Sequence, residues 1–305
     1  MVNVAVAGGT GGVGQTIVEV LGSSHHQAFV LSRKPSKETQ TVTVDYSDIC
    51  SLITVLEIHK IHTVISAFSV EGDSLAKSQK NLIEAAIRSK ETKRFVPSAY
   101  AIPYPRTALQ VLPQLKDYFA AMETLEASNL EWTVFHNGIF LDYFGGPSMK
   151  SYLKPNVFAI DIANRIAAIP GTGDVPVTFT YTFDLARFVV AALDLEKWEE
   201  ESRIVGDAVT WHEFVKLAEE TTGSKFETHY DSIEKLKQFE ITELPNHVAL
   251  YDHFPKKAFQ WFMSIFELFT ANGSSRICQA GSLNERFPEI KPLTVKGMLE
   301  RYWKA

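Results

Sequence analysis

A chain of 305 residues, of which 45% are hydrophobic and 22% charged, has the composition of an ordinary globular protein with a substantial core. The formal net charge of −6 and the lack of a long basic run argue against nucleic acid as a partner. Apolar segments of membrane-spanning length are absent, and the strand expected directly after Met1 leaves no room for a signal peptide, so we expect a cytoplasmic protein. Cys50 and Cys278 form neither a disulfide framework nor a metal-ligand spacing, and we expect no metal site.

The first expected element is a strand over residues 3–7, an apolar run typical of a strand buried on both faces of a parallel sheet. It leads into a glycine-rich segment, residues 8–14, with both the G-x-G-x-x-G spacing and its G-x-x-G-x-x-G variant. Helical spacing of apolar residues follows to Gly22. This order predicts a dinucleotide site in which free amides of the first helical turn face the phosphates. The residues expected to contact them are Gly8, Thr10, Gly11, Gly12, Val13 and Gly14.

The end of the second expected strand, residues 28–31, indicates which dinucleotide is bound. Chains that bind NAD usually place an acidic residue here to hold the ribose hydroxyls. This chain has Ser32 instead, followed by Arg33 and Lys34. Because two cations attract the 2′-phosphate that a carboxylate would repel, we predict NADP(H) as the cofactor. A solvated basic turn is the alternative.

Further strands are expected at residues 41–44, 63–67, 94–96 and 132–135, with helices at 49–56, 75–90 and 115–128. Six alternations of strand and helix predict a doubly wound parallel sheet of Rossmann type. Loops at the carboxyl ends of such strands contact ligands. Asp45 and Tyr46 would flank an adenine or form a plain strand-end turn, and Phe68, which begins a loop over residues 68–72, would contact the cofactor or anchor that loop. The residues of these loops that we expect at the cofactor are Asp45, Tyr46, Ala67, Phe68 and Ser98.

The pattern changes from about residue 145 onwards. Extended pieces are expected at residues 151–154 and 156–160, a turn at 171–174, and a short strand at 227–230. Helices are expected at residues 184–193, 210–223 and 255–272. The last of them carries aromatic side chains that would belong to the core or line a pocket, namely Phe259, Trp261, Phe262, Phe266 and Phe269.

Taken together, these segments resemble the NmrA-like and isoflavone-reductase-like branch of the atypical short-chain dehydrogenases/reductases, above all its fungal members. The matching stretches cover nearly the whole chain: residues 8–14, 32–34, 45–48, 94–98, 131–140, 182–186, 204–207 and 287–290.

The resemblance implies an NADP-binding Rossmann domain over residues 1–145, to which later segments return, and a smaller C-terminal α/β domain over residues 146–305 that mainly binds the substrate. It places His136, Asn137, Gly138 and Phe140 beside the nicotinamide. Members of the family reduce C=C, C=N or benzylic ether bonds of plant and fungal natural products, and others are redox-sensing regulators.

One position departs from the pattern of the family. Its reductases use a lysine on the helix before the sixth strand, and counting back from Trp132 places Tyr118 there. Lys116, two residues earlier, falls on roughly the opposite face of a helix. Tyr118 is therefore a candidate proton donor, its acidity raised by a nicotinamide cation or by Lys116, or else part of a buried helix face. The catalytic candidates are Tyr118, Lys116 and His136, and those for substrate contact are Tyr100, Tyr104, Asp142, Tyr143 and Tyr152.

The leading hypothesis is an NADPH-dependent oxidoreductase that transfers a hydride to a C=N or C=C bond of a hydrophobic, aromatic or alkaloid-like substrate. A variant couples this step to a cyclisation or cycloaddition templated by the pocket. Hydride transfer needs little from the protein beyond positioning and a dry site, so the missing lysine affects proton transfer more than redox chemistry. The alternative, which the missing lysine favours, is a non-catalytic NADP(H)-sensing protein that binds a protein partner.

Overall fold

The computed structural model describes residues 1–35, 40–69 and 74–304, which fall into two compact units. The first unit comprises Met1–Tyr100, Pro105–His136 and Leu185–Ser202. The second comprises Ala101–Tyr104, Asn137–Asp184 and Arg203–Ala305. The continuous part of the first unit therefore ends at His136, whereas we expected a boundary at residue 145. The first unit also includes a later segment, Leu185–Ser202.

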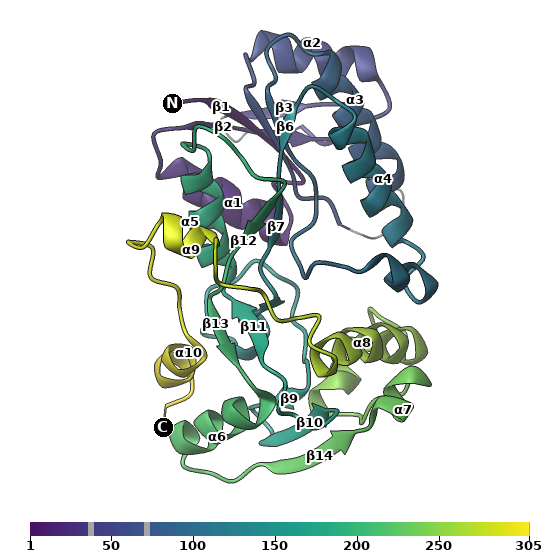
Figure 1. The fold of residues 1–305 in the computed structure, drawn as a ribbon, viewed down its shortest axis with the longest axis vertical. Coiled ribbons are helices and arrows are strands. Elements are labelled where there is room, and N and C mark those ends of the chain that lie inside the picture. Colours follow the sequence, from purple (N-terminus) through teal and green to yellow (C-terminus); the bar gives the residue numbers. More distant parts are fainter. Residues whose placement is uncertain (36–39, 70–73, 305) are drawn as a thin grey trace. The chain divides into compact units, whose positions relative to one another are not determined.

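A six-stranded parallel sheet in the order β3-β2-β1-β4-β5-β6 forms the first unit (Figure 1). Its strands are β1 (Asn3–Ala7), β2 (Gln27–Ser32), β3 (Thr41–Thr43), β4 (Thr63–Ser66), β5 (Arg94–Val96) and β6 (Glu131–Trp132). This is the strand order of the doubly wound dinucleotide-binding fold, with its reversal at β1 and β4. The predicted fold class is confirmed, and the loops expected to hold the cofactor leave the same edge of the sheet.

Helices cover both faces of this sheet, with α2, α3 and α4 on one face and α1 and α5 on the other (Figure 1). Their bounds are α1 (Gly12–Gly22), α2 (Ile49–Ile58), α3 (Lys80–Arg88), α4 (Leu115–Glu126) and α5 (Thr182–Ala192). A π-helical turn (Ser74–Gln79) precedes α3, and a 3-10 turn (Arg106–Gln110) precedes α4. Fully buried Leu52, Leu82 and Leu125 pack α2, α3 and α4 against the sheet in one apolar cluster.

The sixth strand differs from the prediction because the expected strand over residues 132–135 is divided. The main sheet ends with β6 at Trp132, and β7 (Val134–His136) pairs with β12 (Glu201–Arg203) instead. The hydroxyl of buried Thr133 donates a hydrogen bond to Ser202 Oγ (2.8 Å) at the break. The partner strand comes from much later in the chain, so no local pattern could indicate the division.

Two three-stranded sheets, β14-β10-β9 and β13-β11-β8, form the second unit. The strands are β8 (Ile139–Phe140), β9 (Ile160–Asp161), β10 (Ile166–Pro170), β11 (Val177–Thr180), β13 (Asp207–Val209) and β14 (Glu227–Asp231). The extended pieces expected between residues 151 and 160 are irregular apart from the start of β9, and β10 and β11 were not predicted. Both lie beside strands distant in sequence, such as β14 and β13, which stabilise them by pairing.

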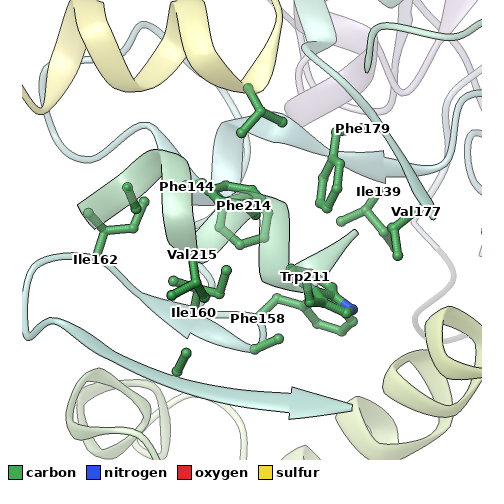
Figure 2. Close-up of a cluster of buried hydrophobic side chains, with 14 of the residues drawn as sticks. Ile139, Phe144, Phe158, Ile160, Ile162, Val177, Phe179, Trp211, Phe214 and Val215 are labelled. Carbon is green, nitrogen blue, oxygen red and sulfur yellow. The ribbon is translucent and has the colours of Figure 1, made fainter. Parts of the chain in front are cut away.

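The core of the second unit is rich in aromatic rings, with Phe144, Trp211 and Phe214 drawn together in Figure 2. The rings of Phe144 and Phe214 are 4.8 Å apart between centroids. The helices of the second unit are α6 (Trp211–Thr222), α7 (Ile233–Lys237), α8 (Lys256–Ala271), α9 (Leu283–Arg286) and α10 (Val295–Tyr302), with 3-10 turns at Leu141–Phe144 and Pro245–Leu250. Of the aromatic stripe on α8, Phe259 and Phe269 are buried, which favours the core alternative for them.

Among the described residues, every helix is too short or too polar to span a membrane.

Candidate functional site

The glycines between β1 and α1 perform different structural tasks. Gly8 has φ of +79°, and a Cβ atom there would lie 2.4 Å from the carbonyl oxygen of Ala67. A Cβ atom on Gly14 would lie 2.3 Å from the carbonyl oxygen of Gly8. Both positions need glycine because main-chain segments touch there.

Gly11, in contrast, is exposed and faces open space. The nearest atom to a Cβ built on it is the carbonyl oxygen of Gly8, at 3.6 Å. Gly11 is the N-cap of the 11-residue helix α1, whose first turn has no acidic residue and, among the described residues, no side-chain cap. The amides of that turn therefore keep their hydrogen-bonding capacity for an anion, and the helix dipole favours negative charge there. This arrangement fits a pyrophosphate.

The basic cluster forms a tight turn directly after β2. Ser32 Oγ donates to the carbonyl oxygen of Lys34 (2.9 Å) and accepts from its N–H group (3.1 Å). The side chains of Arg33 and Lys34 are exposed. Since β2 is the parallel neighbour of β1, both cations lie at the same edge of the sheet as the glycine turn. A 2′-phosphate would meet positive charge at this edge.

Tyr46 and Asp45 differ in their surroundings at the end of the third strand. Tyr46 is buried, its hydroxyl donates to the carbonyl oxygen of Leu31 (3.0 Å), and its burial raises the pKa of the phenol. A ring enclosed in this way is poorly placed to stack on an adenine, which favours the strand-end turn for Tyr46. Asp45 is exposed, and the hydrogen bonds that it accepts from Ser47 lower its pKa.

Hydrogen bonds join the carboxyl end of β4 to the ends of β5 and β1. Ser98 Oγ donates to the carbonyl oxygen of Phe68 (2.7 Å), and Ala67 N–H donates to that of Ala7 (2.8 Å). Phe68 is half-buried, and its ring packs edge-on against Tyr46 with centroids 5.0 Å apart. The loop expected over residues 68–72 is described only to Ser69, and residues 70–72 lie outside the described part of the chain.

Tyr118 and His136 both lie near a carboxylate that the sequence did not indicate. Tyr118 on α4 is 7% exposed, and its burial, together with the charge of Glu201, raises the pKa of its hydroxyl. His136 at the end of β7 is buried, with Nε2 3.9 Å from Glu201 Oε1. The direction of the Tyr118 shift is opposite to the rise in acidity expected from Lys116, whose side chain is exposed. Glu201 arrives through the pairing of β12 with β7, so only the fold reveals it.

Asn137, Gly138 and Phe140 belong to the second unit. Asn137 is fully buried, and its Oδ1 atom has no hydrogen-bond partner among the described residues. Its main-chain N–H donates to the carbonyl oxygen of Ala101 (2.9 Å). Gly138 has φ of +74°, and a Cβ there would lie 2.2 Å from the carbonyl oxygen of Thr178, so this glycine is also obligatory. The half-buried ring of Phe140 packs edge-on against Tyr143.

Three of the tyrosines expected at the substrate are packed against other aromatic rings. Tyr100 stacks on Phe135, and its hydroxyl donates to the carbonyl oxygen of Ser66 (3.1 Å). Tyr104 contacts Phe266 and Phe269 of α8, and Tyr152 contacts Phe183 beneath the ammonium of Lys150. The other two expected residues, Asp142 and Tyr143, line a cavity.

This cavity lies wholly within the second unit and has a volume of about 420 Å³. The size is within the range of small-molecule pockets, which are mostly apolar with a few fixed polar groups. Its apolar walls include Tyr143, Phe144, Met149, Leu153, Ile160, Ile162 and Trp303, and its polar lining includes Asp142, Ser151, Asn156, Asp161 and Asn246.

Two sets of contacts hold the walls of the cavity in place. Buried Asp142 accepts hydrogen bonds from Ser151 Oγ (2.6 Å), Thr182 Oγ1 (2.6 Å) and Thr182 N–H (2.9 Å). Burial raises the pKa of Asp142, and these hydrogen bonds oppose that shift. On another wall, the indole N–H of Trp303 donates to the carbonyl oxygen of Phe144 (2.7 Å). Trp303 follows the last helix, α10, and no local sequence pattern indicates that it lines a cavity.

Comparison with known proteins places this chain among sequences of similar length. A sequence profile of the NmrA-like family matches residues 2–285. Oxidoreductase BOA1 of Botryotinia fuckeliana (strain B05.10) is 40% identical, over 96% of each chain. Oxidoreductase swnN of Metarhizium robertsii (strain ARSEF 23 / ATCC MYA-3075) is 31% identical, over 99% of this chain and 98% of its own. The solved complex of leucoanthocyanidin reductase from Vitis vinifera with NADPH shares the fold, with a TM-score of 0.74 over 99% of both chains at 17% identity.

Proposed function

The chain belongs to the NmrA-like family, and on that premise we propose that it is an oxidoreductase that uses NADPH to reduce a C=N or C=C bond of a hydrophobic natural product. The observation that carries the proposal is the open glycine turn before the uncapped helix α1, at the same sheet edge as Arg33 and Lys34. The names of the relatives and the NADPH in the Vitis vinifera complex support it.

The residues present fit the phosphates of NADPH. The amides after Gly11 would hold the pyrophosphate, because an open glycine lets a ligand approach the main chain. Arg33 and Lys34 would pair with the 2′-phosphate. Asn137 of the second unit has a buried Oδ1 acceptor without a partner among the described residues, which an N–H donor of a ligand would satisfy. When bound, the cofactor supplies the hydride.

The cavity of the second unit would bind the substrate. Its walls of tyrosine, phenylalanine, leucine, isoleucine and tryptophan suit an aromatic or alkaloid-like molecule better than a charged metabolite. Asp142 is already bonded to Ser151 and Thr182, so it would shape the wall. The same apolar walls would template a ring closure in the variant that couples reduction to cyclisation.

Reduction of a double bond adds a hydride to one atom and a proton to the other, so the site also needs a proton donor. Tyr118 would fill this role. Its hydroxyl is protonated at neutral pH, but burial and the charge of Glu201 raise its pKa and weaken it as an acid, so the positive charge of an oxidised nicotinamide would be needed to oppose that shift. The same carboxylate lies 3.9 Å from His136 Nε2.

Oxidation of NADPH, followed at the nicotinamide absorbance band with a panel of hydrophobic imines and enones, tests the proposal. We expect turnover with at least one compound, and we expect Tyr118→Phe to lower kcat by about a hundredfold or more, the usual effect of losing a general acid. The matched control is Tyr251→Phe, which removes a hydroxyl bonded to Glu243 in the second unit.

Each outcome has a distinct meaning. Unchanged turnover in Tyr118→Phe would remove Tyr118 from the mechanism and leave the oxidoreductase standing. If the chain binds NADPH tightly but no compound of the panel causes NADPH to be oxidised, the proposed catalytic function is overturned, and the NADP(H)-sensing alternative is favoured.

A further inference from the structure

Three side chains that bind metals well meet at one place in the first unit. The ligand atoms of His25, His26 and Asp194 all lie within 4.8 Å of one another. His25 Nε2 is 3.0 Å from Asp194 Oδ1, and His26 Nε2 is 3.5 Å from Asp194 Oδ2. Two imidazoles and one carboxylate form a typical donor set for zinc and chemically similar first-row divalent ions. We propose that these three side chains bind one Zn²⁺ or a similar imidazole-preferring divalent ion.

His26 supplies a second, independent observation. Its side chain is only 1% exposed, and its Nε2 atom points to Asp194 without a hydrogen-bond partner among the described residues. An unsatisfied buried nitrogen costs free energy, and coordination of an ion would satisfy it. The side chains of His25 and Asp194 are 57% and 51% exposed, which leaves the other side of the site open to an entering ion and to water ligands.

Coordination of an ion changes the hydrogen bonding of the His26 ring. Val2 N–H donates to His26 Nδ1 over a long 3.3 Å, which places the ring proton on Nε2 in the metal-free protein. Coordination at Nε2 requires the ring proton to move to Nδ1, and this move breaks the weak bond from Val2 N–H. The ring centroids of His25 and His26 are 4.1 Å apart. Zinc–nitrogen bonds are about 2 Å long, so binding would require the exposed His25 ring to rotate toward the ion.

The position of the cluster separates it from the cofactor site. His25 and His26 lie directly before β2, and the N–H of Gln27 donates to the carbonyl oxygen of Val2, so the cluster is at the amino edge of the parallel sheet. The glycine turn is at the carboxyl edge. Asp194 follows α5, 169 residues from His25, on the segment that returns to the first unit. An ion here would cross-link that segment to the turn between α1 and β2 and would take no part in hydride transfer.

Calorimetric titration of the tag-free, chelator-treated full chain with ZnCl₂ tests the site. We expect one ion per chain and a rise in Tm with added zinc, because a ligand of the folded state stabilises it. Mg²⁺, which prefers oxygen ligands, should give neither effect. His25→Ala and Asp194→Asn change exposed side chains, so both variants should fold, and each should weaken zinc binding at least tenfold.

The control is His212→Ala, which removes an exposed imidazole paired with Asp174 (2.9 Å) in the second unit, where no further ligand of this type is grouped with it among the described residues. This variant should bind zinc as the unchanged chain does. The proposal would be overturned if the unchanged chain did not bind zinc, or if His25→Ala and Asp194→Asn bound zinc as tightly as the unchanged chain. Neither result bears on NADPH binding, which is measured separately.

Discussion

At the scale of single residues, alanine substitutions of Gly11 and Gly14 should affect two different properties, cofactor binding and folding stability. A Cβ on Gly14 meets the carbonyl oxygen of Gly8 at 2.3 Å, whereas one on Gly11 meets nothing closer than 3.6 Å. Gly14→Ala should therefore lower the free energy of unfolding by about 1–3 kcal/mol, as overpacking does. Gly11→Ala should change it by about 0.5 kcal/mol or less while hindering the approach of the phosphates.

Urea unfolding and NADPH titration of the two variants check this pair. We expect a lower urea midpoint only for Gly14→Ala, and weaker NADPH binding at unchanged stability for Gly11→Ala. Normal NADPH affinity in Gly11→Ala would show that the phosphates do not approach the main chain at this position.

The side chains of Arg33 and Lys34 should set the preference for NADPH over NADH. Each charge-assisted contact to the 2′-phosphate contributes about 1.5–3 kcal/mol, so Arg33→Ala with Lys34→Ala should weaken NADPH binding by about a hundredfold or more. NADH lacks that phosphate, and its affinity in the same titration is the control that should not change. Equal losses for both nucleotides would mean that the two cations have another role.

At the scale of elements, helix α6 depends on a capping box. Thr210 Oγ1 accepts from Glu213 N–H (3.1 Å), and Glu213 Oε2 accepts from Thr210 N–H (2.8 Å). The helix ends at Gly223 with φ of +65°, a conformation that glycine adopts without strain. Thr210→Ala should therefore lower the free energy of unfolding by about 1 kcal/mol. Thr210→Ser keeps the accepting oxygen, so it should retain most of the free energy of unfolding that Thr210→Ala loses, as measured by urea unfolding. Equal losses in both variants would show that the hydroxyl does not stabilise the helix.

At the scale of the whole molecule, buried Glu267 should make stability depend on pH. It is 1% exposed, and burial, reinforced by the negative charge of Asp231 and opposed by Lys235, raises its pKa well above 4.5. A group whose pKa is higher in the folded state contributes its full stability below its unfolded pKa and loses it as the pH rises through the folded value. The chain should thus lose stability above pH 4.5, by up to about 1.4 kcal/mol per pH unit from this group.

Urea unfolding of Glu267→Gln between pH 5 and pH 8 measures this contribution, which involves about one proton. The neutral amide removes the titration, so the variant should gain stability over the unchanged chain as the pH rises. The exposed Glu240→Gln is the control, for which no such trend is expected. Parallel pH profiles of Glu267→Gln and the unchanged chain would show that Glu267 does not titrate in this range.

The sequence alone determined the fold class of the first unit and the glycine turn between β1 and α1. The apolar run of β1, the glycines of residues 8–14 and the two cations after Ser32 act through neighbours along the chain or through one parallel strand pair. The local spacing of these residues is therefore sufficient to predict the fold class and the family, and both predictions are confirmed.

Only the tertiary structure decided how distant segments complete the candidate sites. Glu201 reaches Tyr118 and His136 through the pairing of β12 with β7, and Trp303 closes a cavity begun by residues near Asp142. Strands β10 and β11 likewise depend on partners far along the chain. Such contacts depend on pairing and packing between segments that are far apart in the sequence. Because the residues near each segment carry no periodic pattern that reports its distant partner, the sequence does not predict these contacts.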